Sequence, residues 1–237
     1  MSISKRKKIY LILIVSVMLV SVLTALLTKS SFASNEEFND LSEYEDALVT
    51  VTSNDSFTSI YFNNNIKDVK ELWQQADTVV RGVPLEPRKH LHQATFTPLQ
   101  VSIVLKGELK ENVINIYEPS DIDFTSQKLS FYYSRSGYLL MENDREYILF
   151  LKKLPVPEGY EKSEEEERSY LPLSTLYAKY PVGSTWEGDI ISSESSDFTL
   201  KDVYGYDILT RDDQILSKYL DFRNQLEQHD YQLNMSE

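Results

Sequence analysis

Two histidines, His90 and His92, are the side chains whose type and spacing come nearest to a metal site. Residues i and i+2 of a β-strand point to the same face, so this pair could share one ion. Glu86 is the only carboxylate close to them in sequence, and Arg88 and Lys89 precede the pair. The alternative is a polar loop that leads into a strand. We therefore assign no metal site, and His90 and His92 stand as the metal candidates.

Two carboxylates, Asp121 and Asp123, offer oxygen ligands for a hard cation, with Glu118 nearby. No glycine follows at the position that a calcium-binding loop requires, so an acidic loop is the alternative. A metal-assisted hydrolase would use Asp121 or Asp123 together with the two histidines. In that case these side chains would lie within a few ångströms of one another.

The other catalytic patterns do not occur in the sequence. There is no G-x-S-x-G elbow, and the 7 glycines form no phosphate-binding loop. The chain has no cysteine, which excludes disulfides, thiol catalysis and thiolate metal sites. We therefore assign no catalytic residue and no cofactor, and a non-enzymatic protein is favoured over an enzyme.

Aromatic residues are the other candidates for function, because the chain contains 16 tyrosines. Exposed tyrosines provide a large contact area at a low cost in side-chain entropy, as a binding face requires. The stretch from 170 to 186 is aromatic without strand or helix periodicity, and it is the predicted contact surface. Its members are Tyr170, Tyr177, Tyr180 and Trp186. The alternative is that these rings lie at the edge of the core of a small barrel.

The N-terminus predicts a position at a membrane. Four basic residues at 5–8 precede twenty uncharged residues at 9–28, which at ~1.5 Å per residue match a ~30 Å hydrocarbon core. The basic cluster favours the cytoplasm, which places the C-terminal body outside. Small residues at Ser31 and Ala33 also fit a signal-peptidase site. The body is therefore either tethered by a single-pass anchor or secreted after cleavage behind Ala33.

The charge of the body excludes some partners. The whole chain carries −13, but five of its 24 basic residues and none of its 37 acidic residues lie in the first 33 positions. The remainder therefore carries about −18, which repels phosphate backbones and anionic lipid surfaces. We expect no binding to nucleic acid.

Hydrophobic patterning predicts a mainly β fold with helices, of the α+β type. A helix is expected over 66–77 with Asn65 as its N-cap, and a final helix begins at Asp212 or Asp213. The apolar run at 147–151 predicts a central strand buried on both faces. The other expected strands lie at 47–52, 57–62, 78–83, 99–106, 113–117, 128–133 and 198–201. Short strands with one packed helix indicate a small antiparallel barrel, and an open sandwich is the alternative.

Three segments in a fixed order carry a family resemblance. They are A-D-T-V-V-R-G at 76–82, V-S-I-V-L-K-G at 101–107 and Y-I-L-F-L at 147–151. The series resembles exported or membrane-anchored proteins of Gram-positive bacteria, and it is similar to the OB-like barrel of the netrin and metalloproteinase-inhibitor class. The resemblance covers roughly 70–155 and implies a fold and a location. The inhibitors depend on cysteines that this chain lacks, so it implies no inhibitory mechanism.

Together these expectations divide the chain into six segments. They are a cytoplasmic basic tail at 1–8, a transmembrane segment or signal-peptide core at 9–28, a linker at 29–46, an OB-like β domain at 47–154, a polar and aromatic insertion with a last strand at 155–200, and a C-terminal helical region at 201–237.

Three functions are consistent with this organisation. The first is a non-enzymatic module outside the membrane that binds a protein, a peptide or a glycan at the cell surface. The second is an extracytoplasmic hydrolase, metal-assisted through His90 and His92. The third is a structural or regulatory partner of a membrane complex, whose final helix would expose an apolar stripe at Leu216, Leu220 and Leu226.

Overall fold

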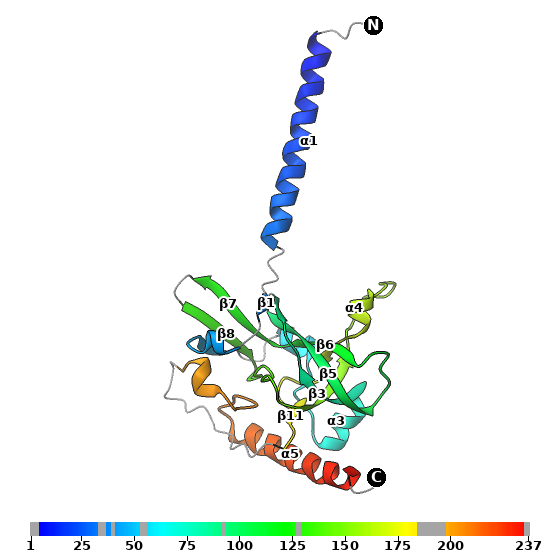
Figure 1. Ribbon diagram of the computed structural model, residues 1–237, viewed down its shortest axis with the longest axis vertical. Coiled ribbons are helices and arrows are strands. Elements are labelled where there is room, and N and C mark those ends of the chain that lie inside the picture. The colour runs from blue at the N-terminus through cyan, green and yellow to red at the C-terminus, as the bar shows by residue number, and fades with distance from the viewer. Residues whose placement is uncertain are drawn as a thin grey trace. The chain divides into compact units, whose positions relative to one another are not determined.

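The computed structural model describes residues 5–32, 37–38, 41–52, 56–91, 93–126, 129–183 and 198–234 (Figure 1). The chain forms two compact units, Met1–Glu36 and Glu37–Glu237. The first unit contains one helix, α1 (Lys5–Phe32), whose apolar residues are spread over all its sides. Among the described residues, no helix is both long and apolar enough to cross a membrane, so the predicted span is not confirmed.

The second unit is built on a closed five-stranded barrel. Its strands follow one another around the barrel in the order β5, β3, β9, β10 and β6, and β6 pairs with β5 to close it. All neighbours are antiparallel except β6 and β10, which run parallel. This architecture is consistent with the predicted OB-like barrel. The strands are β3 (Thr78–Pro84), β5 (Ala94–Lys106), β6 (Val113–Glu118), β9 (Tyr147–Lys153) and β10 (Ser169–Pro172).

Further strands extend the barrel and form a second sheet. The strand β4 (Arg88–Leu91) pairs with β5, β1 (Glu37–Phe38) pairs with β4, and β11 (Lys179–Pro181) pairs with β9. A separate three-stranded sheet has the order β2 (Leu48–Thr52), β8 (Leu129–Arg135) and β7 (Ser120–Ser126), with β2 and β8 parallel.

Short helices connect these strands, and one long helix ends the chain. The short ones are α2 (Ser56–Tyr61), α3 (Val69–Gln75), α4 (Glu164–Glu167) and the 3₁₀ turns η1 (Leu41–Tyr44) and η2 (Leu200–Val203). Figure 1 shows the long helix, α5 (Asp213–Asn234), lying along one end of the second unit close to α3. The backbone N–H of Gln214 donates to Asp212, which explains why the helix begins where an aspartate was expected to cap it.

The largest part of the core lies between α5, α3 and β9. The five residues at 147–151 of β9 are all buried, as their uninterrupted apolar run predicted. The ring of Phe150 meets Trp73 of α3 and Tyr180 of β11 edge-on. Tyr180 in turn stacks on Tyr219 of α5 with ring centroids 4.9 Å apart. These aromatic contacts fix the final helix to the barrel.

The apolar stripe of α5 is part of this core. Leu226 is buried, and Leu220 packs against the same cluster while Leu216 is half-buried. Leu220 and Leu226 therefore pack against the core rather than form the exposed docking face that the third function requires.

Two of the expected elements have a different structure. The segment expected as a strand at 57–62 forms α2, and its Ile60 is exposed. The last expected strand, at 198–201, is replaced by the turn η2, and Thr199, just before the turn, forms an isolated bridge to Leu48. Both segments are rich in β-branched or aromatic residues, but β propensity yields to context when no neighbouring strand pairs along the whole segment.

The helix expected over 66–77 is shorter than the sequence suggested. It begins at Val69 of α3, because Asp68 rather than Asn65 is the N-cap and accepts a hydrogen bond from the backbone N–H of Glu71. Asn65 instead donates its backbone N–H to the side chain of Asn63.

Two of the expected segment boundaries also differ from the structure. The expected linker at 29–46 contributes β1 and η1, and its Phe38 and Leu41 are buried in the core. The expected insertion at 155–200 contributes β10, without which the barrel would not close. The β domain is therefore longer than the segment 47–154.

Candidate binding site

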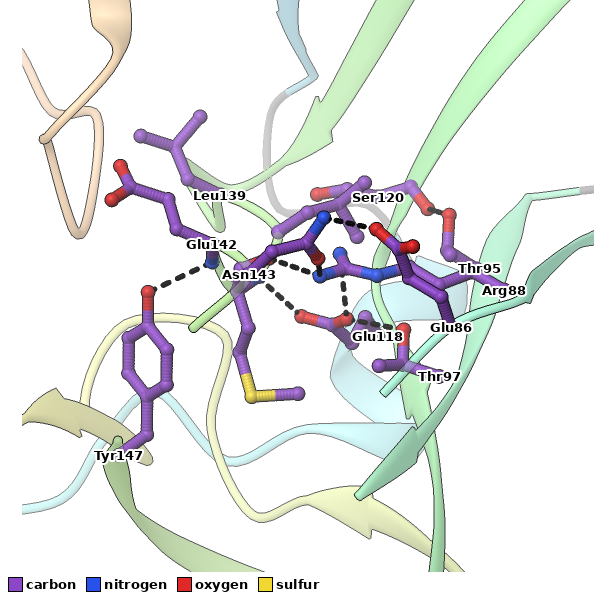
Figure 2. Close-up of polar contacts among 12 residues, drawn as sticks. Glu86, Arg88, Thr95, Thr97, Glu118, Ser120, Leu139, Glu142, Asn143 and Tyr147 are labelled. Carbon is purple, nitrogen blue, oxygen red and sulfur yellow. Dashed lines mark hydrogen bonds and ion pairs between the residues drawn. The ribbon is translucent and has the colours of Figure 1, made fainter. Parts of the chain in front are cut away.

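A buried ion pair lies at one end of the barrel. Arg88 of β4 and Glu118 at the end of β6 are 1% and 0% exposed, and Arg88 Nη1 lies 3.8 Å from Glu118 Oε1 (Figure 2). Burying two charges is costly unless hydrogen bonds satisfy their remaining polar atoms. The partners of the two side chains therefore decide what this pair contributes.

The Glu118 carboxylate is surrounded by donors. Thr97 donates its hydroxyl to Oε1 at 2.5 Å, while the Tyr138 hydroxyl and the backbone N–H of Met141 donate to Oε2 at 3.0 Å and 2.9 Å. Burial raises the pKa of Tyr138, and the adjacent Glu118 charge raises it further. The phenol therefore stays protonated as a donor, and the carboxylate holds the 138–141 segment against the barrel.

Arg88 connects this network to the surface. Its Nη2 donates to the backbone carbonyl of Met141 at 2.6 Å and to Asn143 Oδ1 at 2.7 Å. The side-chain amide of Asn143 donates in turn to the exposed carboxylate of Glu86. Figure 2 shows this sequence of contacts from Glu118 through Arg88 and Asn143 to Glu86. The buried pair thus fixes the orientation of a half-exposed amide.

That amide lies in a cleft of about 390 Å³. Three stretches far apart in sequence form it, and its lining residues are Leu41, Ser42, Glu142, Asn143, Tyr204 and Gly205. A volume of this size suits a small ligand or one side chain of a larger partner.

Several contacts hold the cleft walls together. Glu142 Oε1 accepts the backbone N–H of Gly205 at 2.7 Å, and Glu142 Oε2 lies 3.4 Å from Arg145 Nη1. The backbone N–H of Glu142 donates to the Tyr147 hydroxyl at 2.8 Å. Leu41 forms the remaining wall from the core cluster that also contains Leu139 and Leu140. The polar groups of the cleft are therefore positioned before any ligand arrives.

A second buried charge cluster lies around Lys179 of β11. This side chain is 2% exposed, donates to the Leu139 carbonyl at 2.6 Å, and lies over the ring of Tyr138 at 4.8 Å. Burial lowers the pKa of Lys179 to about 8, and burial raises the pKa of nearby Asp207. A lysine with a lowered pKa is suited to nucleophilic chemistry when a substrate can reach it. Lys179 is buried and does not line the cleft, so it forms part of the core.

Of the two histidines predicted as metal candidates, the structure describes His90. His90 of β4 lies with its Nδ1 2.8 Å from Asp121 Oδ1 of β7, which brings together a histidine and an acid that the hydrolase hypothesis paired. Asp121 Oδ2 also accepts the backbone N–H of Gln93 at 3.0 Å. His92 and the side chain of Asp123 lie outside the described residues. Among the residues that are described, no group of three or more metal-binding side chains occurs.

The predicted aromatic contact surface is not an exposed face. Tyr170, Tyr177 and Tyr180 are 5%, 2% and 1% exposed, and they pack in the core clusters around β9. The alternative of core tyrosines therefore describes these three. Their backbone lies in β10, in β11 and in the turn between them, and both strands pair with β9, so the rings turn inward. Trp186 lies outside the described residues.

No pattern of residue types or spacing in the sequence indicates the cleft. Glu142 and Asn143 stand in a polar interruption between the apolar residues at 139–141 and the strand β9, which reads as an ordinary turn. Tyr204 and Gly205 follow η2 more than 60 positions later. Only a close look at polar turns that flank the central strand would have drawn attention to this place.

No family model matches this chain, and comparisons with the curated proteins and with the solved structures return no match. The barrel, the buried network and the cleft are therefore the basis on which a function is inferred.

Proposed function

We propose that the protein is a non-enzymatic ligand-binding module that works outside the cell membrane. Its ligand is a protein, a peptide or a glycan of the cell surface, and the cleft at Glu142 and Asn143 is its binding site. The proposal includes a tether at 9–28 if that segment is retained, or secretion if it is cleaved after Ala33.

One observation carries the binding proposal. The cleft presents a carboxylate and an amide whose orientation is set from beneath by Arg88 and from the side by Gly205. Groups fixed in this way lose little conformational freedom when they bind, so more of the interaction energy appears as affinity. An exposed loop with free rotamers would not offer this advantage.

The chemistry of the cleft favours binding over catalysis. Its described lining offers a carboxylate, an amide and hydroxyl groups, but neither of the described basic side chains considered above, Lys179 and His90, is among the lining residues. A general base must lie within hydrogen-bond reach of the proton that it abstracts. The described lining therefore places no histidine or lysine beside Glu142 as a partner for acid–base chemistry.

The location rests on the N-terminal sequence. The cluster at 5–8 is basic and the twenty residues at 9–28 carry no charge, a combination typical of a segment that enters a membrane. The test is the mass of the mature protein in the membrane and medium fractions of expressing cells. A species that starts at Ser34 in the medium indicates secretion, and a full-length species in the membrane indicates a tether. Recovery of the full-length chain from the cytosol alone would contradict the proposal.

Site-directed photocrosslinking tests the binding site. A photoreactive amino acid replaces exposed Ser42 at the cleft, and the matched control places it at exposed Glu158 on the 154–163 loop. We expect a discrete crosslinked product from position 42 that is missing from position 158, with its identity read by mass spectrometry. Equal labelling from both positions would show that the cleft is not a preferred site.

A hydrolase is the second candidate, because His90 Nδ1 lies 2.8 Å from Asp121 Oδ1, within the few ångströms that this hypothesis requires. The test of this hypothesis measures the rate of p-nitrophenyl acetate hydrolysis with and without zinc. It compares the full-length protein with its His90→Ala variant. Activity that His90→Ala removes would favour the hydrolase, and an equal background rate in both proteins would reject it for this substrate.

A further inference from the structure

We propose that the cleft at Glu142 binds an alkylammonium group, of the kind that a lysine side chain or a polyamine carries. This inference rests on the proposed function and adds the chemical class of the ligand. Three features of the described cleft support it: the acceptor capacity of Glu142, the acidic residues around the rim, and an aromatic side chain in the lining.

The first feature is the carboxylate of Glu142. An ionised carboxylate offers about four lone-pair sites and no donor, so it selects ligands that donate. One of its oxygens accepts from Gly205 N–H at 2.7 Å, and the other lies 3.4 Å from Arg145. These contacts orient the carboxylate and leave it capacity for further donors. A primary ammonium has three donors and carries the complementary charge.

The second feature is the charge of the surroundings. The exposed side chains next to the lining residues in sequence are Glu43 beside Ser42 and Asp144 beside Asn143. Glu86, also exposed, is bound to the amide of Asn143. The nearby arginines already form ion pairs within the protein, because Arg88 pairs with Glu118 and Arg145 pairs with Glu142 and Asp207. An acidic rim on a body of about −18 attracts cations and repels anionic ligands.

The third feature is Tyr204, which lines the cleft and is 37% exposed. A cation over the face of an aromatic ring is attracted by the ring's negative face, even at an exposed site. A carboxylate and a tyrosine in one cleft provide the two interactions that an ammonium group uses best. A neutral sugar would use the ring but would gain nothing from the acidic rim.

The test compares full-length protein in an uncharged detergent against two cationic probes and one neutral probe. The probes are tetralysine, spermidine and chitotetraose, and dissociation constants come from isothermal titration calorimetry at fixed ionic strength. Because an acidic body binds cations non-specifically, the variants change charge locally. Ser42→Arg and Ser42→Glu place opposite charges at the exposed cleft mouth, and Gln74→Arg and Gln74→Glu make the same net changes on α3.

We expect Ser42→Arg to weaken tetralysine binding about two- to fivefold and Ser42→Glu to strengthen it by a similar factor, as one exposed charge pair does. The Gln74 variants should change the affinity less than twofold. Glu142→Gln should weaken binding more than Ser42→Arg, and the Ser42 pair keeps the test valid if loss of the Gly205 contact unfolds that variant. Comparable affinity for spermidine assigns the ammonium group alone as the ligand, whereas preference for tetralysine assigns a peptide.

Other outcomes overturn the inference. Equal effects at positions 42 and 74, or no tetralysine and no spermidine binding, mean that the cleft does not select ammonium groups. If chitotetraose binds and Ser42→Arg leaves its affinity unchanged, the ligand class is wrong while the binding module stands. If no probe binds and photocrosslinking from position 42 also finds no partner, the proposed function falls as well.

Discussion

Replacement of Arg88 by methionine removes the cation that forms an ion pair with the buried carboxylate of Glu118. Glu118 is 0% exposed, so water cannot replace the lost partner. Breaking a buried ion pair by removing one member typically costs about 3–5 kcal/mol, because an uncompensated charge stays buried. The variant also loses the hydrogen bonds from Arg88 to Met141 and Asn143. We therefore expect the free energy of unfolding to fall by about 3–5 kcal/mol.

A double-mutant cycle separates the charge effect from the loss of packing. Glu118→Gln alone exchanges an acceptor for a donor beside Thr97, Tyr138 and Met141, which costs about 1–3 kcal/mol in unsatisfied polar groups. In the double variant no charge remains buried at this place. The combined loss should be smaller than the sum of the single losses by about 1–3 kcal/mol, as for contacting residues.

Urea unfolding of the full-length protein in mild detergent, followed by tryptophan fluorescence, measures these values. Trp73 packs edge-on against Phe150 with ring centroids 6.3 Å apart and reports on the core. Arg168→Met is the matched control, because Arg168 pairs with Glu111 at 3.0 Å while both side chains are about half exposed. It should cost less than about 1 kcal/mol. Equal losses for the two arginine variants, or additive losses in the cycle, would refute the reasoning.

Three further predictions concern single residues. Burial lowers the pKa of Lys179 from 10.5 to about 8, so the unfolded chain binds this proton more tightly than the folded protein does. The free energy of unfolding therefore rises as the pH rises from about 8 towards 10.5. Thermal unfolding should show a gain of about 1 kcal/mol between pH 7 and 9, and Lys179→Met should abolish this gain. Gly137→Ala should prevent folding, because the new Cβ would lie 1.9 Å from the Leu209 carbonyl oxygen. Gly159→Ala is the control: Gly159 also has a positive φ, but its Cβ would meet nothing within 4 Å, so the change should cost only about 1–3 kcal/mol. Soluble yield and melting temperature measure the two effects. Asp68→Ala should lower the free energy of unfolding by about 1 kcal/mol, because the N-cap of α3 is lost, and Asp68→Asn should restore most of it in the same urea titration.

The elements that the sequence predicted best are those whose signals are local. The strand β9 was predicted from five consecutive apolar residues at 147–151, and all five are buried. The strands expected at 99–106 and 113–117 lie in β5 and β6, which pair as antiparallel neighbours. The start of α5 followed from an aspartate before an apolar periodic segment. In each case the residues that carry the signal are neighbours in the chain.

The elements that the sequence did not predict depend on distant partners. The strand β10 has only four residues and ends in Pro172, so it has too few positions to show a period. It is a strand because Tyr170 lies between Ile116 of β6 and Lys153 of β9. The segment at 57–62 shows the converse, since strand-like residues form α2 and no strand in the described part of the chain pairs with them.

The candidate site shows the same division. The sequence paired His90 with nearby acids, and the structure brings His90 to Asp121 because β4 and β7 are neighbours. The aromatic surface was expected from residue type alone, yet Tyr177 and Tyr180 are buried. A tyrosine can lie either in the core or on an exposed binding face, so residue type does not distinguish the two. Here the packing of β11 on β9 decides that the rings are buried.

The sequence by itself determined the properties that need no partner. It fixed the absence of cysteine chemistry, the acidity of the body after residue 33, the basic and apolar N-terminus, and the alternation that makes β5 a strand. The tertiary structure alone decided that Arg88 and Glu118 are buried together and that stretches around 41, 142 and 204 form one cleft. The physical reason is that periodicity and composition are properties of neighbouring residues. The energy of a buried charge, in contrast, depends on groups that only the closed barrel brings within hydrogen-bond distance.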